Sequence, residues 1–581
     1  MTIAPRPGGR AAPADGITLP ACGFLHTLSV MASAPPASAP GFTGLARSWI
    51  DRNFLALGRE MRLSYLPPLM VYVAAGISGL TSIVATFYIK ERLGLSAEFL
   101  AGLAFWAGLP WALKVPLGHL VDLIWRWKGA LVFAGAGLIA ASVGIMIGLL
   151  GSTESMRALW SVEAWFVFST LLAPIGYVVQ DVVADAMTVE AVPRFDAEGR
   201  PTGMAERKSM NTTVQTLGRV AIIGGTVLVS LANVYLLRGV GELPEAEKAL
   251  AYLRVYQLAL IIPVISVLGV VLAMALKWRD ARRLAAKGFA KSEVRRMLDP
   301  HPERPPINWW IIGGGVAFAV VSLGVGIGDV TGGQEIVFGA SMAIVLFLMW
   351  RITSELEPEA RHVLVGTAVL VFVFRAVPGP GAGSTWWMID QLGFDQQFLA
   401  ELSLIGSVLT LAGLFVFRRF MAERSMAYIV GSLTVATTII GAPVVGLYYG
   451  LHHWTAAHTG GFVDARMIVL IDTAIESPLG QIAMVPMLAW IANSAPDRLK
   501  ATFFAVMASF TNLALAAAQL GTKYLNQAFV VTREVRDASG AVTTPADYSQ
   551  LGTLLVLTAV ITFVVPMLAV LFVKTTRFRS A

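Results

Sequence analysis

The fold of this chain is decided by a stretch that reads QDVVADAMTVE, residues 180–190. It continues an apolar run, residues 159–179, and the two together are long enough for a helix that crosses a membrane. Asp181 and Asp185 are four residues apart, so they lie on one face of that helix. An ionised carboxylate near the bilayer centre costs at least roughly 2.5 kcal/mol, so such groups usually face a partner, a cavity or a proton path. The stretch therefore predicts a membrane span that carries a polar site.

The composition agrees with a protein that lies largely inside a membrane. Of its 581 residues, 56% are hydrophobic and 14% are charged, whereas soluble domains have about 25% charged residues. The apolar runs are continuous and rich in Leu, Ala, Gly and Val, unlike the alternating strands of a barrel. We therefore expect an all-α polytopic membrane protein of fourteen spans. They are read at residues 66–90, 96–120, 129–151, 159–190, 209–235, 253–277, 308–328, 336–351, 362–390, 396–417, 426–449, 464–492, 501–523 and 551–574.

Residue usage excludes several functional classes. Cys22 is the single cysteine, which excludes an internal disulfide and a thiolate metal cluster. We expect no metal site, no cofactor and no enzymatic activity. The net charge of +7 requires no nucleic-acid partner, because Lys and Arg gather in alternate loops. Basic loops stay on the cytoplasmic side, so the pattern predicts a bacterial inner-membrane protein with both termini in the cytoplasm. The oligomeric state is left open.

Two segments precede the first span. Residues 1–40 are rich in Ala, Pro and Gly, which is typical of a disordered tail, and either Met1 or Met31 fits as the start. In residues 41–62, apolar side chains alternate with Arg as in an amphipathic helix. This helix lies either on an anionic lipid surface or against the underside of the helical body.

A motif between the second and third spans resembles the cytoplasmic loop signature of the major facilitator superfamily. It reads GHLVDLIWR, residues 118–126, and keeps the Gly118, Asp122 and Arg126 of that signature while departing at Leu123 and Trp125. The resemblance implies a gating role for the three kept residues and a fold of six plus six helices, with a two-helix insertion. The domains are then a six-helix bundle at 63–277, a basic linker at 278–307, an inserted hairpin at 308–351 and a second bundle at 352–581.

A narrower resemblance is carried by several separated motifs. The first half contains LPWALK at residues 109–114 and DVVADA at residues 181–186, followed by Glu190. These motifs are similar to those of the folate-biopterin transporter family. The second half matches the same family at Pro378, at LGF (392–394), at AP (495–496) and at ATFFA (501–505), which leads to Asn512. The resemblance covers roughly residues 66–277 and 362–574.

Each half carries an acidic pair four residues apart, on helices that are pseudo-equivalent in a six-plus-six fold. The pairs are Asp181/Asp185 and Asp472/Glu476. In transporters built from repeats, substrate and ion sites lie near the midplane between the halves. We therefore expect Asp181 or Asp185 to take the coupling proton, and Asp472 and Glu476 to bind substrate. The alternative is that each pair only neutralises a cation on a neighbouring span.

Three cations inside the spans are candidate partners and candidate substrate-binding residues. At ~1.5 Å of rise per residue, Arg219 and Asp181 lie at similar depths, so the two can meet. Arg375 lies in the first span of the second half, at a depth that matches Glu476 more loosely. Lys114 belongs to the second span and to the motif of the family resemblance. Its side chain either anchors the helix at the interface or contacts substrate.

The resemblance implies a secondary transporter that moves a pterin-like or folate-like organic anion by alternating access, with protons as the coupling ion. Two other interpretations remain at this stage. The chain also resembles muropeptide permeases, whose cargo is a sugar-peptide. It could instead be a non-transporting assembly or pigment-delivery factor that keeps the same fold.

Overall fold

The computed structural model describes residues 56–193, 200, 202–298, 307–328, 330–354, 357–417, 420, 424–480, 482, 500–536, 542–576 and 578. The chain divides into two units, residues 1–60 and residues 61–581. The first unit contributes helix α3 (Ala56–Arg59). The expected tail at 1–40 lies outside the described residues, as does most of the expected amphipathic helix at 41–62. The second unit contains the apolar helices.

The first half of the second unit consists of six apolar segments, three of which are built from two helices that meet at a break. The proline at position 110 lies in the break between α6 and α7, where its missing N–H suits a 3-10 turn. The helices are α4 (Leu66–Gly76) with α5 (Ser82–Arg92), α6 (Ala97–Gly108) with α7 (Lys114–Leu123), α8 (Lys128–Gly151), α10 (Val162–Ala191), α11 (Met204–Leu236), and α12 (Glu245–Ala259) with α13 (Ile261–Ala286); short α9 (Thr153–Leu159) precedes α10.

The second half begins after α14 (Lys291–Leu298), in the basic linker. The run PGPG at residues 378–381 separates two helices, because proline donates no hydrogen bond and Gly381 adopts a φ of 80°. The helices are α15 (Trp309–Ile327), α16 (Gly333–Thr353), α17 (Pro358–Arg375), α18 (Ala382–Leu392), α19 (Gln396–Val416), α21 (Met426–Tyr448), α22 (Leu451–His458), α23 (Ala465–Glu476), α25 (Lys500–Ala528) and α26 (Leu551–Thr575), and β1 (Val535–Arg536) pairs antiparallel with β2 (Val542–Thr544).

The all-α polytopic architecture is confirmed, whereas the count of fourteen spans is not. Eleven helical segments of the described chain are long and apolar enough to cross a membrane. The expected span at 362–390 is split between α17 and α18 by the PGPG break, and the expected span at 501–523 falls inside α25. In the expected span at 464–492, α23 ends at Glu476, and most of the remainder lies outside the described residues.

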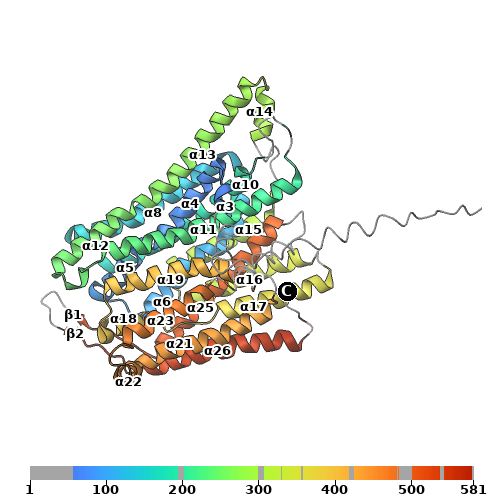
Figure 1. Ribbon diagram of the computed structural model, residues 1–581. Helices are drawn as coiled ribbons and strands as arrows, with labels where there is room; N and C mark the ends of the chain where they lie inside the picture. The colour runs from blue at the N-terminus through green and yellow to red at the C-terminus, as the bar shows by residue number, and fades with distance from the viewer. Residues whose placement is uncertain are drawn as a thin grey trace, which may run out of the picture. The chain divides into compact units, whose positions relative to one another are not determined.

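The helices of the second unit run side by side between two ends (Figure 1). We call the end that carries β1, β2 and α22 the β end, and the opposite end, to which the basic linker is attached, the linker end. The two halves meet where α11 packs against α19 and where α6 packs against α25. Helices α15 and α16 form a hairpin, in which α16 packs against α25 and α15 against α7.

Glycines allow two helix pairs of the first half to approach closely. A Cβ added to Gly225 on α11 would lie 2.8 Å from the Cα of Gly76 on α4. A Cβ added to Gly135 on α8 would lie 2.7 Å from the carbonyl oxygen of Gly176 on α10. Small residues at such crossings let the backbones meet, which is a main source of helix association inside a membrane. The helices that carry the acidic pair and its neighbours are therefore held at short range.

This packing predicts that Gly225→Ala destabilises the protein although it adds a single methyl group. The methyl would overlap α4, and overpacking of this kind costs about 1–3 kcal/mol. The neighbouring Gly224→Ala is the matched control, because a Cβ at Gly224 meets nothing within 4 Å. Thermal unfolding in detergent, followed by fluorescence, should show a lower midpoint for Gly225→Ala alone. Equal midpoints for the two variants would contradict the close approach.

Candidate functional site

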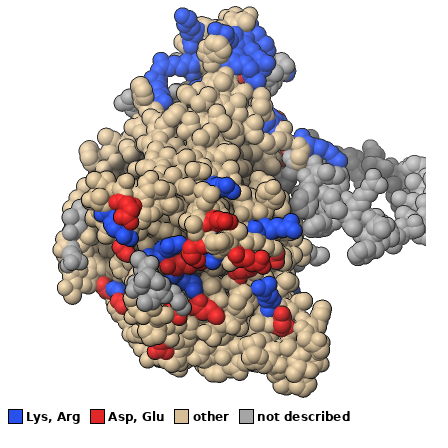
Figure 2. Space-filling model, turned by 90° about the vertical axis from the view of Figure 1, so that its left-hand side faces the viewer, with Lys and Arg blue, Asp and Glu red and all other residues tan. Residues whose placement is uncertain are grey.

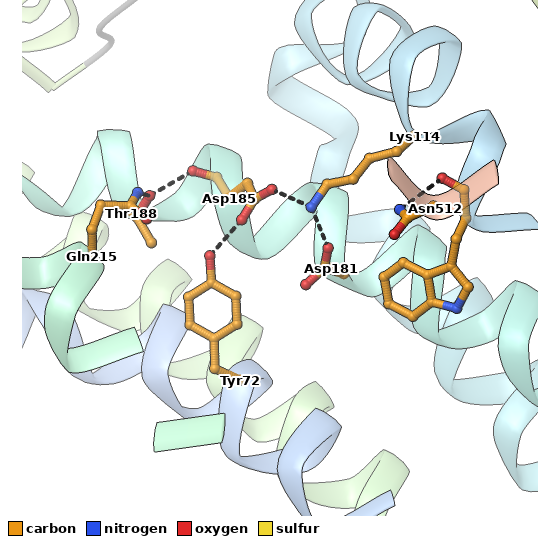
Figure 3. A network of polar contacts seen from close by, with 8 residues as sticks. Tyr72, Lys114, Asp181, Asp185, Thr188, Gln215 and Asn512 are labelled. Atoms are coloured by element: carbon orange, nitrogen blue, oxygen red, sulfur yellow. Dashed lines mark hydrogen bonds and ion pairs between the residues drawn. The ribbon is translucent and has the colours of Figure 1, made fainter. Parts of the chain in front are cut away.

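The acidic pair of α10 is bound by a lysine at the start of α7. The Nζ atom of Lys114 lies 2.6 Å from Oδ2 of Asp181 and 2.8 Å from Oδ2 of Asp185 (Figure 3). The side chains of Lys114 and Asp181 are mostly buried, with 18% and 13% of their surface exposed, whereas 41% of the Asp185 side chain is exposed. One ammonium group thus holds two carboxylates in the interior of the first half.

The break between α6 and α7 places Lys114 in this position. The 3-10 turn Leu109–Leu113 ends where α7 begins, at Lys114 itself. Asn512 of α25 donates a hydrogen bond of 3.4 Å to the carbonyl oxygen of Trp111 in the same turn. The turn that orients the lysine is therefore also in contact with the second half of the protein.

A tyrosine and a polar chain extend the site across α4 and α11. The hydroxyl of Tyr72 donates to Oδ1 of Asp185 at 2.6 Å, and a Cβ at Gly218 would lie 2.9 Å from the ring of Tyr72. The Thr188 hydroxyl donates to the carbonyl oxygen of Asp185, and the Gln215 amide donates to the Thr188 hydroxyl. Figure 3 shows these groups converging on Asp185 from three sides.

The ion pair between Arg219 and Asp181, which was expected from their similar depths in the membrane, is wrong. Arg219 is exposed and forms an ion pair with neither Asp181 nor Asp185. The ammonium group of Lys114 already lies between these two carboxylates. Arg219 lies on α11 next to Gly218, and its charge still acts on Asp181. Matching depths along two helices do not fix which way each helix faces. The structure thus leaves Arg219 without a carboxylate partner in the described part of the chain, close to a carboxylate that is already neutralised.

The second acidic pair differs from the first. Asp472 Oδ1 is buried without a hydrogen-bond partner among the described residues, and Glu476 is exposed at the end of α23. No described Lys or Arg comes within ion-pair distance of either, and Arg375, half-buried at the end of α17, does not pair with Glu476. The two halves therefore share the spacing of their acidic residues, but a described cation neutralises only the pair of the first half.

The predicted gating residues lie on or beside α7 at the linker end. Gly118 and Asp122 are half-buried and Arg126 is exposed. A Cβ at Gly118 would meet nothing within 4 Å, so close packing does not require this glycine. Nearby, Glu190 accepts from Lys128 and from Lys277, each at 2.9 Å. Sequence reasoning missed this ion triad, although Glu190 belonged to the motif.

A second polar network joins the two halves at the β end. Lys90 of α5 lies 2.5 Å from Asp390 of α18, and the Tyr548 hydroxyl donates to the other oxygen of Asp390. The Arg533 guanidinium donates to the carbonyl oxygens of Lys90 and Leu95 at 2.8 and 2.7 Å. Burial raises the pKa of Tyr548, and the hydrogen bond to Asp390 raises it further, so the hydroxyl stays protonated and donates. None of these residues was singled out from the sequence.

Comparison with known proteins finds similarity to one family of membrane proteins. Residues 337–579 match the model of the BT1 family. A folate-biopterin transporter of Synechocystis sp. is 22% identical over 475 residues, which are 80% of this chain and 74% of that protein. The chain is therefore similar to the BT1 family over its second half, and to a folate-biopterin transporter over most of its length. Another relative, a putative folate transporter 2 of Plasmodium berghei, is 24% identical over 161 residues, 26% of this chain and 32% of that protein.

Solved structures show the same fold at low identity. An auto-inhibited peptide transporter of the POT family superposes with a TM-score of 0.55 at 12% identity, covering 90% of this chain and 98% of that one. A POT family transporter in complex with 5-aminolevulinic acid gives 0.53 at 13% identity, covering 88% and 95%. The major facilitator fold and the resemblance to folate-biopterin transporters are thus confirmed. This protein is a membrane transporter of a small molecule, not an enzyme.

The lysine bridge predicts that Lys114→Gln is strongly destabilising. Removing one partner of a buried ion pair leaves an uncompensated charge and costs about 3–5 kcal/mol. Adding Asp181→Asn to Lys114→Gln should recover part of that loss, because it removes one orphaned charge. The control is Lys277→Gln, whose side chain is 48% exposed and whose ion pair is worth about 0–1 kcal/mol. The unfolding midpoints of Lys114→Gln, of the double variant and of Lys277→Gln measure these effects. A double variant that is less stable than Lys114→Gln would contradict the bridge.

Proposed function

We propose that this protein is a secondary transporter that carries a pterin-like or folate-like organic anion across the bacterial inner membrane together with protons, by alternating access. The observation that carries the proposal is the bridge of Lys114 to Asp181 and Asp185. A buried cation shared by two carboxylates is a site where an anionic substrate can replace one of them. The printed name of the Synechocystis relative supports the substrate class.

Coupling follows from charge conservation at the bridge. With all three groups ionised, Lys114, Asp181 and Asp185 carry a net charge of −1, which repels an anion. Protonation of one aspartate neutralises it and breaks its ion pair with the Lys114 ammonium group. A carboxylate of the substrate then pairs with Lys114 in place of that aspartate. Asp185 is the better candidate for release because it is more exposed than Asp181. Proton and anion therefore bind together, and the charge of the site stays constant.

The other candidate residues fit roles around this centre. Arg219 is exposed beside Tyr72 and offers a guanidinium group, which binds a carboxylate with two parallel hydrogen bonds. Arg375 precedes the PGPG break in the corresponding region of the second half. Asp472 and Glu476 can accept hydrogen bonds from the amino and ring N–H groups of a pterin. Gly118, Asp122 and Arg126 at the linker end remain the proposed gating residues.

The polar network at the β end supports alternating access. Lys90, Asp390, Arg533 and Tyr548 hold the two halves together there, and Gln396 of α19 donates to the Tyr252 hydroxyl of α12 at 2.7 Å. Figure 2 shows acidic and basic side chains lying next to each other across this end. By the distribution of basic loops, this end faces the periplasm. The structure then corresponds to a state in which the periplasmic side is closed.

The first functional prediction concerns the proton. Asp185→Asn should abolish uptake driven by a proton gradient in proteoliposomes while the protein remains folded, because an amide cannot bind and release a proton at this site. The control is Asp280→Asn, which removes a partly exposed carboxylate of α13 whose ion pair within the described part of the chain is with its neighbour Arg279. Uptake of labelled folate or pterin at several external pH values measures the effect. Unchanged flux and pH dependence in Asp185→Asn would refute the coupling role.

The second functional prediction concerns the contacts that close the β end. Lys90→Ala should loosen the closed state and expose the contact between α11 and α19. The probe is Ser230→Cys in a Cys22→Ser background, because Ser230 is 1% exposed and contacts Ser403 of α19 at 2.7 Å. A membrane-impermeant maleimide should label this cysteine faster after Lys90→Ala. Ser142→Cys is the control, because Ser142 is buried between α8 and α10 of one half. Equal acceleration at both positions would indicate unfolding rather than opening.

The substrate class is tested by ligand stabilisation. A ligand present at 100 times its dissociation constant stabilises the folded state by about 2.7 kcal/mol. Pterins and folates should raise the unfolding midpoint, whereas nucleosides should not. Stabilisation by muropeptides instead would favour the permease interpretation. Absence of saturable flux for every compound, in folded protein, would favour a scaffold.

A further inference from the structure

A crevice at the β end lies between the inserted hairpin and the transporter body. Its volume is about 660 Å³, within the roughly 300–1,000 Å³ of ordinary ligand pockets. It is lined by α6, the first part of α10, the hairpin and α25. Phe99 and Leu323 on its walls are 45% and 62% exposed. In a helix bundle inside a membrane, such exposed apolar side chains face lipid, so the crevice opens sideways into the bilayer.

The lining changes from polar to apolar along the membrane normal. Glu98 and Gln334 lie in the first turns of α6 and α16, and Ser322 and Lys523 lie five residues from the ends of α15 and α25. At 1.5 Å per residue, all four are within about 8 Å of the β end. Trp106 and Leu171 lie about 13 Å in. An occupant must therefore have a polar head at the interface and an apolar body below it.

The polar rim has acceptors that lack donors. Oε1 of Gln334 and Oγ of Ser322 are buried without a hydrogen-bond partner among the described residues. The Gln334 amide nitrogen is already bound to the carbonyl oxygen of Gly102 at 3.2 Å, which fixes the direction of Oε1. Glu98 accepts from Gln527 at 2.6 Å, and no ion pair joins it to a described cation. An unmade bond at a buried polar atom costs about 1–3 kcal/mol, so the rim favours a donor-rich group.

We propose that the crevice binds one aminophospholipid of the leaflet at the β end, such as phosphatidylethanolamine. A primary ammonium group has three N–H donors, which match Gln334, Ser322 and the carboxylate of Glu98. The phosphate of the head group lies toward Lys523. One N–H group of the Lys523 ammonium points to Glu335, at an N–O distance of 3.3 Å, and the other two can bind the phosphate. The acyl chain fills the apolar part below. The lipid thereby joins the hairpin to α6 and α10.

Head-group chemistry separates this proposal from nonspecific solvation. Phosphatidylcholine has the same charge but no N–H donor, and phosphatidylglycerol has no cation. Purified full-length protein should retain one phosphatidylethanolamine in native mass spectrometry and unfold at a higher temperature in nanodiscs that contain it than in nanodiscs of the other two lipids. Glu98→Gln should weaken retention about tenfold and remove the preference over phosphatidylcholine. Glu154→Gln, an exposed carboxylate at the same end, should change neither.

A steric variant tests the acyl site independently. Gly326→Leu should fill the crevice, because a Cβ at Gly326 would already lie 3.4 Å from the Trp106 ring. Gly324→Leu is the matched control on the same helix, since a Cβ there meets nothing within 4 Å. The expected result is loss of the bound lipid in Gly326→Leu alone, with a normal unfolding midpoint in detergent.

Other outcomes would overturn the proposal. Equal retention of all three lipids would leave only nonspecific filling by an acyl chain or detergent. A mass adduct that is a second copy of the chain, lost in Gly326→Leu, would identify a dimer interface instead. Failure of lipid binding leaves the proposed transport function untouched, because the lysine bridge lies in a different part of the bundle.

Discussion

The bridge of Lys114 to Asp181 and Asp185 is the interaction on which the interior of the first half depends. Two carboxylates four residues apart on one span are unfavourable in a low-dielectric interior unless a cation lies between them. Lys114 can reach that position only because α7 starts anew after the 3-10 turn that follows α6. The turn is bonded to α25 through Asn512. A local break in one helix thus determines the charge state of the site and links it to the opposite half.

The acidic pairs of the two halves differ in what surrounds them. The spacing of the acidic residues is the same in α10 and α23, but a described lysine neutralises the pair of α10 only. A neutralised pair favours an anion that exchanges with a carboxylate, whereas an uncompensated pair favours hydrogen-bond donors or protons. In the proposed cycle, a pterin that carries both a carboxylate and amino groups can use both halves at once. Closure around such a molecule would draw the halves together.

The sequence was sufficient for the class of fold and for an acidic pair on one face of a span, because hydrophobicity and helical periodicity are local properties. The partner of the pair was not predictable in the same way. Depth along a helix placed Arg219 and Asp181 at similar levels. The rotation of α11 and the break before α7 nevertheless make Lys114, and not Arg219, the partner of the two aspartates. The contact of Tyr72 with Asp185 joins residues 113 positions apart, and nothing in the local sequence indicates it. The network of Lys90, Asp390 and Arg533 was missed because its members lie near span ends, where charged residues are ordinary.

The site and the β end are connected by a single span. Tyr72 on α4 contacts Asp185, and Lys90 on α5 contacts Asp390 of the other half, while the 3-10 segment Ile77–Thr81 lies between them. The 18 residues from Tyr72 to Lys90 extend about 27 Å, and the turn between the two helices provides a place where the span can bend. Release of Asp185 from the bridge alters the hydrogen bond that anchors one end of this span. In the proposed cycle the other end then loosens its hold on α18, so proton uptake at the site and opening at the β end are consequences of one movement.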